Sequence, residues 1–493
     1  MIISFLYKNQ NILRNYTKHM DRFTGVIGIV LILLLAYLMS NNRRAINFKT
    51  IGIGLLLQTS LALFILGTDA GRNLFGWLGK GVTKVLDFSN EGGSFVFGVL
   101  ADAGLVNKAF GQGGFIFFFK IIPTIIFVAA LVNIFYHVNL GIYILGTYNI
   151  IKTLIKRLFS SMLMKQIGSE AGMNMSFKEF YTTDEHLGIL PAVVQILADI
   201  MKKIMNISGT EALSNISSAF VGQVEAQIMI KPYLKSMTTS ELMASMTGSF
   251  ACISGGVMAA YIGMGVPAHF LIAASIMAAP GALVISKIMN PETEESKTTG
   301  DVRLKVDKQF SNLVDAISSG CSDGLKIGLN VMAMLIGFLA LIALINFLLS
   351  KFGGQLIHWG LTPELIGWNL RTLDLNNILG FWFSGLARAM GVPANEMMQA
   401  GALMGKKLVA NEFVAYSDLA PQIAAHTLSP KTIAIVSFAL CGFANFGSVG
   451  IQIGGISALE PSRRADIAKL AFRALIAGTL ASYLSACLAG IIL

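Results

Sequence analysis

Apolar runs long enough to cross a lipid bilayer recur along this chain, and they restrict its fold more than any other feature. A helix that crosses about 30 Å of hydrocarbon needs about 20 mostly apolar residues. Charged residues make up only 13% of the sequence, against about 25% in soluble domains. The sequence therefore predicts an all-α polytopic membrane protein, with about eight spans. The expected spans are Thr24–Met39, Thr50–Gly67, Gly114–Phe135, Met237–Gly265, Ala268–Met289, Leu325–Leu349, Thr432–Gly455 and Ile467–Leu493.

The positive charge of the chain fits a membrane surface better than a nucleic acid. The net charge is +10, and most Lys and Arg residues stand near the ends of apolar segments, where the positive-inside bias places them. The basic loop 41–49 favours a cytoplasmic position for that loop. Basic residues before the first span favour the opposite orientation, and a translation start at Met20 would remove most of this conflict.

Two segments are apolar but too often interrupted to cross the membrane as single helices. They are Gly188–Leu234, with Glu225, and Leu379–Tyr416, with Glu412. Each pattern favours a re-entrant helical hairpin, since irregular backbone at membrane depth is tolerated only inside protein or beside water. Carboxylates are costly in lipid, so both glutamates are candidate functional residues. A hairpin followed by a Gly- and Ser-rich span occurs in both halves, which is typical of a transporter with inverted repeats.

The remaining segments complete the expected organisation. Phe88–Gly104 is too short and polar to span and is expected to form an interfacial helix. We divide the chain into an N-terminal extension (1–22), scaffold spans (23–137), a surface insertion (138–186), the first half of a transport unit (187–290), a connector with a long scaffold span (291–378) and the second half of the transport unit (379–493).

Four short motifs together resemble a known family. They are Gly-Gln-Val-Glu-Ala from Gly222, Lys-Pro-Tyr-Leu from Lys231, Asn-Glu-Phe-Val-Ala-Tyr from Asn411 and Phe-Ala-Asn-Phe-Gly-Ser from Phe443. The chain resembles the concentrative nucleoside transporters in their bacterial eight-span form. This resemblance implies a homotrimeric, multi-pass symporter of the bacterial cytoplasmic (inner) membrane. It implies a mobile transport unit that moves like an elevator against a scaffold, with no enzymatic activity and no organic cofactor.

The resemblance also implies a substrate site. Its expected base-facing residues are Gln223, Val224 and Glu225, and its expected ribose-facing residues are Glu412, Asn445 and Ser448. Val257 and Phe443 would line the pocket. A carboxylate suits the sugar because it accepts hydroxyl hydrogen bonds that are charge-assisted and about twice as strong as neutral ones. Val224 stands where relatives carry Thr or Ser, so the base preference stays open.

The same resemblance bears on the coupling ion. The sodium site of sodium-coupled members would fall on Ser218, Val221, Cys252 and Ile253. Ser218 replaces an Asn and Cys252 replaces a hydroxyl residue, which weakens a site for an ion that prefers oxygen ligands. We therefore favour coupling to H+, carried by Glu225 or Glu412, with Na+ coupling as the alternative.

Other interpretations of these residues stay open at this level. Glu412 would have a structural role, as a buried acid, if it pairs with Lys406 or Lys407. Glu225 would have the same role if it pairs with Lys231. Glu211 is expected to have a helix-capping or packing role. An uncoupled channel or receptor would share the architecture. An intramembrane enzyme would need an acidic metal-binding pair or a Ser/His/Asp set, and no acidic pair of suitable spacing lies in a span.

Overall fold

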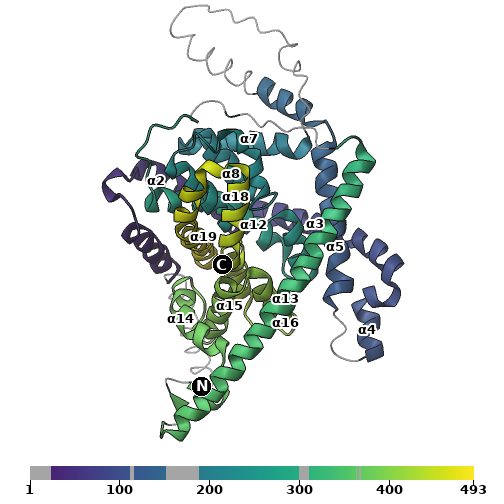
Figure 1. Cartoon of the computed structure of the whole chain (residues 1–493), viewed down its shortest axis with the longest axis vertical. Coiled ribbons are helices and arrows are strands. Elements are labelled where there is room, and N and C mark those ends of the chain that lie inside the picture. The colour runs from purple at the N-terminus through teal and green to yellow at the C-terminus, as the bar shows by residue number, and fades with distance from the viewer. Residues whose placement is uncertain are drawn as a thin grey trace, which may run out of the picture.

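The computed structural model describes residues 24–110, 116–151, 188–298, 302, 310–361, 364–365 and 368–493. Helices dominate this part of the chain (Figure 1). Two antiparallel strands, β1 (Glu364–Leu365) and β2 (Trp368–Asn369), have two residues each. The expected N-terminal extension and residues 152–186 of the expected insertion lie outside the described residues, and Gly141–Ile151 forms a short helix.

The described residues contain six helices that are long and apolar enough to cross a membrane. Shorter apolar helices lie where two further spans were expected, one at Thr24–Leu38 and the pair α17 (Pro430–Leu440) and α18 (Phe446–Leu459). These elements confirm the expected all-α polytopic fold. The six are Phe48–Gly67 (α2 with a π-helical end), Phe117–His137 (α5), Thr239–Gly263 (α10 and α11), Ala268–Met289 (α12), Leu313–His358 (α13) and Pro461–Ile492 (which includes α19).

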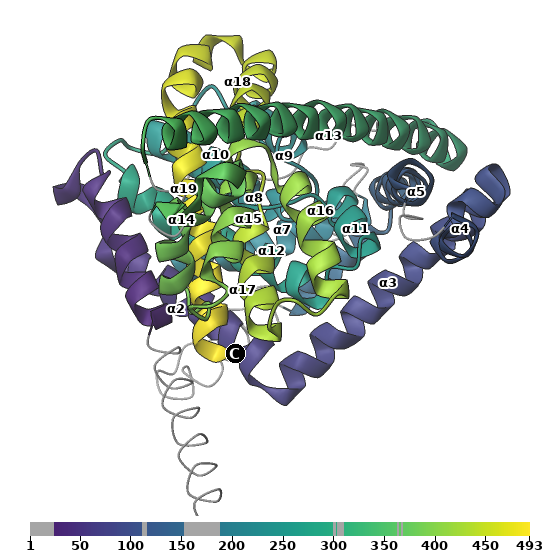
Figure 2. The same ribbon diagram turned by 90° about the horizontal axis from the view of Figure 1, so that it is seen from below.

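Two of these helices differ most in burial. The most apolar 18-residue window of α19 (Arg464–Ile492) is 83% buried, whereas the corresponding window of α13 is 0% buried. Helices α10, α12 and α17 pack around α19, which forms the centre of the core. Helix α13 runs along the outside of the molecule (Figure 2), so its apolar surface faces lipid or another subunit.

Helix α13 is anchored to the rest of the protein through α5. A side chain at Gly320 would bring its Cβ within 2.5 Å of the Ala130 Cα, and one at Gly324 within 2.6 Å of the Ile126 Cα. Small residues at such positions let membrane helices approach closely. The sequence prediction for this span was too short, because α13 continues through polar turns to 46 residues in total.

The first hairpin is shorter than predicted. Residues 189–205 form a separate amphipathic helix, α7 (Ile189–Met205), which ends at Asn206 in a left-handed conformation. The hairpin itself consists of α8 (Gly209–Ser218), an irregular tip, and α9 (Glu225–Met229) with a 3-10 turn at Lys231–Tyr233. Then α10 (Thr239–Ala251) and α11 (Gly255–Gly263) form a span that is broken at residues 252–254.

The second hairpin also has other bounds than predicted. It consists of α15 (Met397–Val409) and α16 (Glu412–Ala424), and the preceding α14 (Leu375–Ala389) is a separate helix packed along α15. The following span is broken between α17 and α18 at residues 441–445. Both halves therefore contain a hairpin followed by a broken span.

The expected interfacial helix over Phe88–Gly104 is wrong in its bounds. Helix α3 (Asp69–Phe97) has 29 residues and ends before a 3-10 turn over Gly98–Ala101, and α4 (Ala103–Phe110) follows. Gly98 has a φ of +57°, a conformation that interrupts a right-handed helix. The earlier start escaped the sequence analysis because several glycines lower the helix propensity of residues 69–87.

Candidate functional site

Glu412 lies at the tip of the second hairpin, at the start of α16. The side chain of Asn411 caps this helix by accepting a hydrogen bond from the Val414 N–H at 2.8 Å. Glu412 is 5% exposed, and the positive end of the α16 dipole stabilises its carboxylate. Its two oxygens accept hydrogen bonds from the Tyr261 hydroxyl and from Asn445 Nδ2, each at 3.0 Å. The carboxylate thus joins hairpin 2 to both broken spans.

Asn445 holds the break between α17 and α18 in place. Its Oδ1 caps α18 by accepting from the Ser448 N–H at 2.9 Å, while its Nδ2 donates to Glu412. Gly442, with a φ of +144°, lets this break approach the first one, because a Cβ there would lie 2.7 Å from the Phe250 carbonyl oxygen. Asn445 and Ser448 are both buried, on the same face of α18 as expected from their spacing.

Main-chain hydrogen bonds join the two breaks and the first hairpin. The Phe443 N–H donates to the Cys252 carbonyl at 3.2 Å, and the Gly255 N–H donates to the Phe220 carbonyl at 3.1 Å. Phe443 and Val257 are half-buried beside these contacts. The polar backbone of both broken helices is thereby partly satisfied inside the protein, as irregular backbone in a membrane requires.

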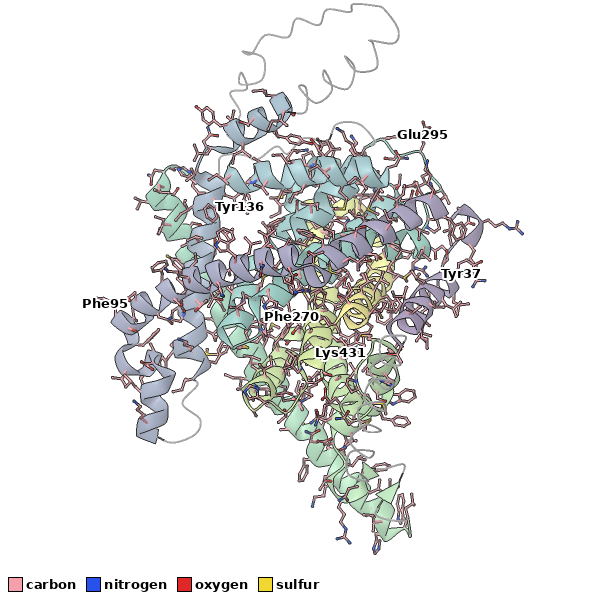
Figure 3. All side chains as sticks on the ribbon, turned by 180° about the vertical axis from the view of Figure 1, so that it is seen from behind. Tyr37, Phe95, Tyr136, Phe270, Glu295 and Lys431 are labelled. Carbon is pink, nitrogen blue, oxygen red and sulfur yellow. The ribbon has the colours of Figure 1, made fainter. Side chains whose placement is uncertain are left out.

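The tip of hairpin 1 lies against the same region. Gln223 and Val224 are half-buried and Glu225 is exposed. Val224 contacts α18, because a Cβ at Gly455 would lie 2.8 Å from the Val224 Cγ2. Glu225 folds back over Gly222 and is close enough to Tyr136 of α5, labelled in Figure 3, to interact with it electrostatically. The structure therefore places both hairpin tips at the broken spans.

The expected ion-site residues are all buried, but their side chains do not form a set of free oxygen ligands. The Ser218 hydroxyl donates to the Ser214 carbonyl at 2.8 Å and lies 3.2 Å from the Ser249 hydroxyl. Ser249 in turn accepts from Gln227 at 2.9 Å. Cys252 is a free thiol. The described residues contain no group of three or more His, Cys, Asp and Glu residues that could hold a metal ion.

Comparison with known proteins decides which family this arrangement represents. Three family models cover most of the chain: "Na+ dependent nucleoside transporter N-terminus" matches residues 27–100, "Nucleoside recognition" matches 118–268 and "Na+ dependent nucleoside transporter C-terminus" matches 270–490. The chain belongs to the concentrative nucleoside transporter family. The predicted resemblance is confirmed.

Individual relatives agree with this assignment. A transporter of Haemophilus influenzae is 37% identical over 96% of this chain and 98% of its own length. The nucleoside permease NupC of Helicobacter pylori is 34% identical over 95% and 97%, and the mouse sodium/nucleoside cotransporter 1 is 33% identical over 96% and 64%. The structure of CNTnw in an inward-facing substrate-bound state superposes with a TM-score of 0.77, at 34% identity over 95% of this chain and 98% of that chain. These relatives are transporters and permeases, so the expectation of a transporter and not an enzyme is confirmed.

In this nucleoside transporter, neither Lys406 nor Lys407 forms an ion pair with Glu412 among the described residues. Lys406 pairs with Asp418, and Lys407 donates to the Ala439 carbonyl at 2.9 Å. In the described part of the chain no ion pair joins Glu225 to Lys231.

Tyr261 belongs to the site although the sequence did not indicate it. It stacks on Tyr416 with ring centroids 4.3 Å apart and donates a hydrogen bond to Glu412. The residues around Tyr261 in the sequence do not indicate this contact, because Tyr261 and Glu412 are 151 positions apart in the chain.

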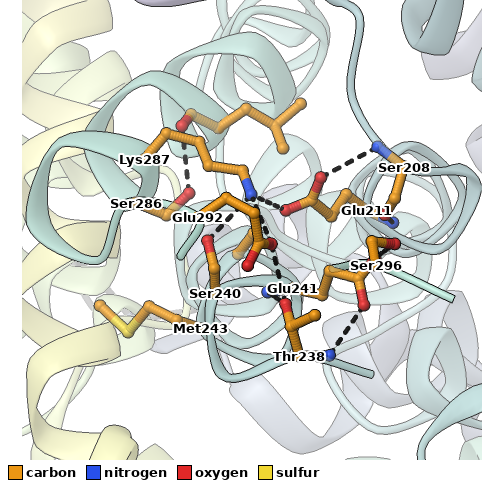
Figure 4. Close-up of polar contacts among 12 residues, drawn as sticks. Ser208, Glu211, Thr238, Ser240, Glu241, Met243, Ser286, Lys287, Glu292 and Ser296 are labelled. Atoms are coloured by element: carbon orange, nitrogen blue, oxygen red, sulfur yellow. Dashed lines mark hydrogen bonds and ion pairs between the residues drawn. The ribbon is translucent and has the colours of Figure 1, made fainter. Parts of the chain in front are cut away.

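A second polar cluster fixes the hairpin 1 half of the transporter (Figure 4). Glu211 forms a capping box with Ser208 at the start of α8, which confirms its predicted role as a helix cap. It also pairs with Lys287 near the end of α12. Glu241 caps α10 with Thr238 and accepts hydrogen bonds from the connector, at 2.5 Å each, from Ser296 and Thr298. The cluster therefore anchors α8, α10, α12 and the connector to one another.

A cavity of about 830 Å3 lies elsewhere in the molecule. Its walls come from the end of α2 with its π-helical turn, from α3, from the start of α12 including Phe270 (labelled in Figure 3), and from Leu493. None of the site residues named above lines it. We therefore base the assignment of the substrate site on the geometry around Glu412 and not on the size of this cavity.

Proposed function

We propose that this protein imports nucleosides across a bacterial cytoplasmic membrane, driven by a proton gradient. The observation that carries the proposal is the buried carboxylate of Glu412, held between Tyr261 and Asn445 where the second hairpin meets both broken spans. A buried carboxylate without an ion-paired lysine has a strong tendency to accept further hydrogen bonds, and a solute rich in hydroxyl groups supplies them.

Glu412, Asn445 and Ser448 form the proposed sugar subsite. Each carboxylate oxygen of Glu412 uses one hydrogen bond inside the protein, and an ionised carboxylate has capacity for about four. Two hydroxyl groups of a ribose would fill the remaining capacity. A site built in this way rejects solutes that lack the hydroxyl groups, because its buried polar groups would then be left unpaired.

Gln223, Val224 and Glu225 form the proposed base subsite, with Val257 and Phe443 as its apolar walls. The side chains of Gln223 and Glu225 supply both donor and acceptor groups, which match the polar edges of a nucleobase. The sugar subsite includes the tip of hairpin 2 and the base subsite includes the tip of hairpin 1, so one nucleoside would bind to both tips at once. Substrate binding would thereby hold the two halves of the transport unit, 187–290 and 379–493, together.

Proton coupling is favoured over sodium coupling by the surroundings of Ser218. Its hydroxyl is engaged with Ser214 and Ser249, and a thiol occupies position 252. Sodium, a hard cation, prefers oxygen ligands to sulfur. Glu225 or Glu412 would carry the proton instead. Sodium coupling is the second candidate, because the matching family models are described as Na+ dependent and the mouse relative is named as a sodium cotransporter.

We also propose a homotrimer with elevator-type transport. The outer surface of α13 is apolar and exposed along most of its length, and α5 packs beside it. These two helices therefore suit a scaffold that contacts other subunits and lipid. Structures of CNTnw or its variants have been obtained in inward-facing, intermediate and outward-facing states, which is the behaviour expected of alternating access.

Uptake into proteoliposomes tests the substrate and the coupling ion separately. Purified full-length protein would be reconstituted, and labelled uridine and adenosine offered under an inward proton gradient or an inward sodium gradient at fixed pH. We expect accumulation with the proton gradient, loss of accumulation when a protonophore is added, and no stimulation by sodium. Accumulation that requires sodium would reject proton coupling, and absence of uptake and binding for every nucleoside would reject the proposed substrate class.

A further inference from the structure

Gln452 lies in the middle of α18 with its whole side-chain amide unused. It is 0% exposed, yet neither its Nε2 nor its Oε1 has a hydrogen-bond partner within the protein. Buried amides are normally paired, since an unpaired donor or acceptor must lose its hydration without compensation. Gln227, another fully buried glutamine, uses both atoms, donating to Ser249 and accepting from Ser245. Gln452 is therefore an exception that calls for a partner from outside the chain.

The position of Gln452 on α18 indicates where that partner would lie. Residues 445, 448 and 452 follow one another at helical spacing and share the buried face of α18, whereas residues 446, 447, 450, 451 and 454 are exposed. Asn445 and Gln452 are two turns, or about 10 Å, apart along the helix axis. This separation is comparable with the length of a sugar joined to a base. A solute whose sugar is held at Asn445 and Glu412 would thus extend along α18 towards Gln452.

The tip of hairpin 1 lies at the same level of α18. Gly455 is close to Gln452 on the helix surface, and it contacts Val224. The Oε1 of Gln223, next to Val224, is likewise buried and without a partner. Two glutamine side chains with unused polar atoms therefore come from two elements that touch each other. Val224 between them has no hydroxyl and offers no hydrogen bond to a base.

We propose that Gln452 is a specificity-determining residue that hydrogen-bonds an edge of the nucleobase opposite Gln223. The inference rests on the proposed nucleoside transport and adds a base contact on α18. An amide presents one acceptor and one donor side, so it pairs with an adjacent carbonyl and amino or imino group of a base, as amide side chains do with base edges in nucleic-acid recognition. In this protein the α18 amide takes over the reading of the base that Val224 does not perform.

Substitution of Gln452 separates this role from a structural one. In proteoliposomes, uridine, cytidine, adenosine, guanosine and inosine would compete with the labelled nucleoside that the wild-type protein transports best. For Gln452→Leu we expect the affinity for the best nucleoside to fall by about tenfold to a hundredfold and the order of preference among bases to change. The penalty for deoxyribonucleosides should stay as in the wild type, because the sugar subsite is intact.

A matched control is a leucine substitution at Gln58. This glutamine is also 0% exposed, but it donates to Ser485 and to the Met277 carbonyl, where α2 meets α12 and α19. Gln58→Leu should lower the melting temperature and leave the order of base preference unchanged. Gln452→Glu provides a second variant at the site, which keeps the size of the side chain and removes its donor. It should weaken most those bases that need a donor from the protein.

Two results would overturn the assignment. One is an unchanged base preference and affinity in both Gln452 variants, provided that they reach the membrane in normal amounts. The other is a nucleoside-bound structure of the wild-type protein in which the Gln452 amide contacts only water or protein, and this test applies even if both variants misfold. If the wild-type protein neither binds nor transports any nucleoside, the proposed function itself fails, and that outcome is distinct from the failure of the Gln452 assignment.

Discussion

Replacement of Glu412 by glutamine is the most direct test of the proposed sugar subsite. The change keeps the size of the side chain and one carbonyl oxygen, so one of the two donors, Tyr261 or Asn445, retains its acceptor. It removes the negative charge, and its new NH2 group faces either the Tyr261 hydroxyl or the Asn445 amide, which now donate to the carboxylate at 3.0 Å each. The variant should therefore fold but bind the ribose less tightly.

The size of the effect follows from the change in hydrogen-bond type. A hydrogen bond to a charged group contributes about 1.5–3 kcal/mol, and a neutral one about 0.5–1.5 kcal/mol. For two ribose hydroxyl groups the loss is about 2–3 kcal/mol, and since about 1.4 kcal/mol corresponds to tenfold in affinity, we expect a 30- to 150-fold weaker affinity, approximately. Discrimination against deoxyribonucleosides should shrink as well, because the lost interaction is with the hydroxyl groups.

The assay compares equilibrium binding and uptake of ribo- and deoxyribonucleosides by the full-length protein and its variant. A matched control is Glu396→Gln, the residue immediately before α15. Glu396 is 8% exposed and accepts hydrogen bonds from the Ser429 hydroxyl at 2.8 Å and from the Ser429 N–H. That variant should lose stability but keep its affinity for nucleosides. Near-normal affinity and ribose discrimination in Glu412→Gln would refute the sugar subsite.

Three further changes test the packing around the site. Gly442→Ala should sharply reduce binding and the yield of folded protein, because its Cβ would meet the Phe250 carbonyl oxygen at 2.7 Å. Its φ of +144° is also a backbone conformation that costs a non-glycine residue about 1–3 kcal/mol. Binding assays and size-exclusion chromatography measure both effects. Lys287→Met should lower the free energy of unfolding by about 3–5 kcal/mol, because it leaves Glu211 buried without its ion pair, and a melting curve in detergent reports this. Lys407→Met should also lower the melting temperature, since Lys407 is 0% exposed and donates to the Ala439 carbonyl, and an unchanged melting curve would contradict it.

Glu412 illustrates how far local sequence reasoning reaches. A carboxylate in an apolar chain is costly enough to indicate a functional residue on its own, and the structure places Glu412 in contact with Asn445, one of the residues expected beside it. The helical spacing of Asn445 and Ser448 likewise predicts that they share a face. Such inferences succeed because burial cost and helical periodicity are properties of a few neighbouring residues.

Hairpin bounds illustrate where the sequence analysis failed. Gly188–Leu234 was assigned to one hairpin, but α7 ends at Asn206 and the hairpin starts after its own cap at Ser208. The motifs were correct while the lengths were not, since caps and packing partners decide where a helix ends. The same applies to α13, whose polar ends continue as helix beyond the apolar run that predicted it.

By itself, the sequence determined that this chain is a membrane protein with two interrupted halves, because lipid excludes charge and unpaired backbone from all but a few places. Only the tertiary structure decided which side chains meet there. Tyr261 reaches Glu412, Lys407 is turned towards Ala439, and Gln452 is left without a partner. These outcomes depend on how separate helices approach one another, and no local pattern of residues records that.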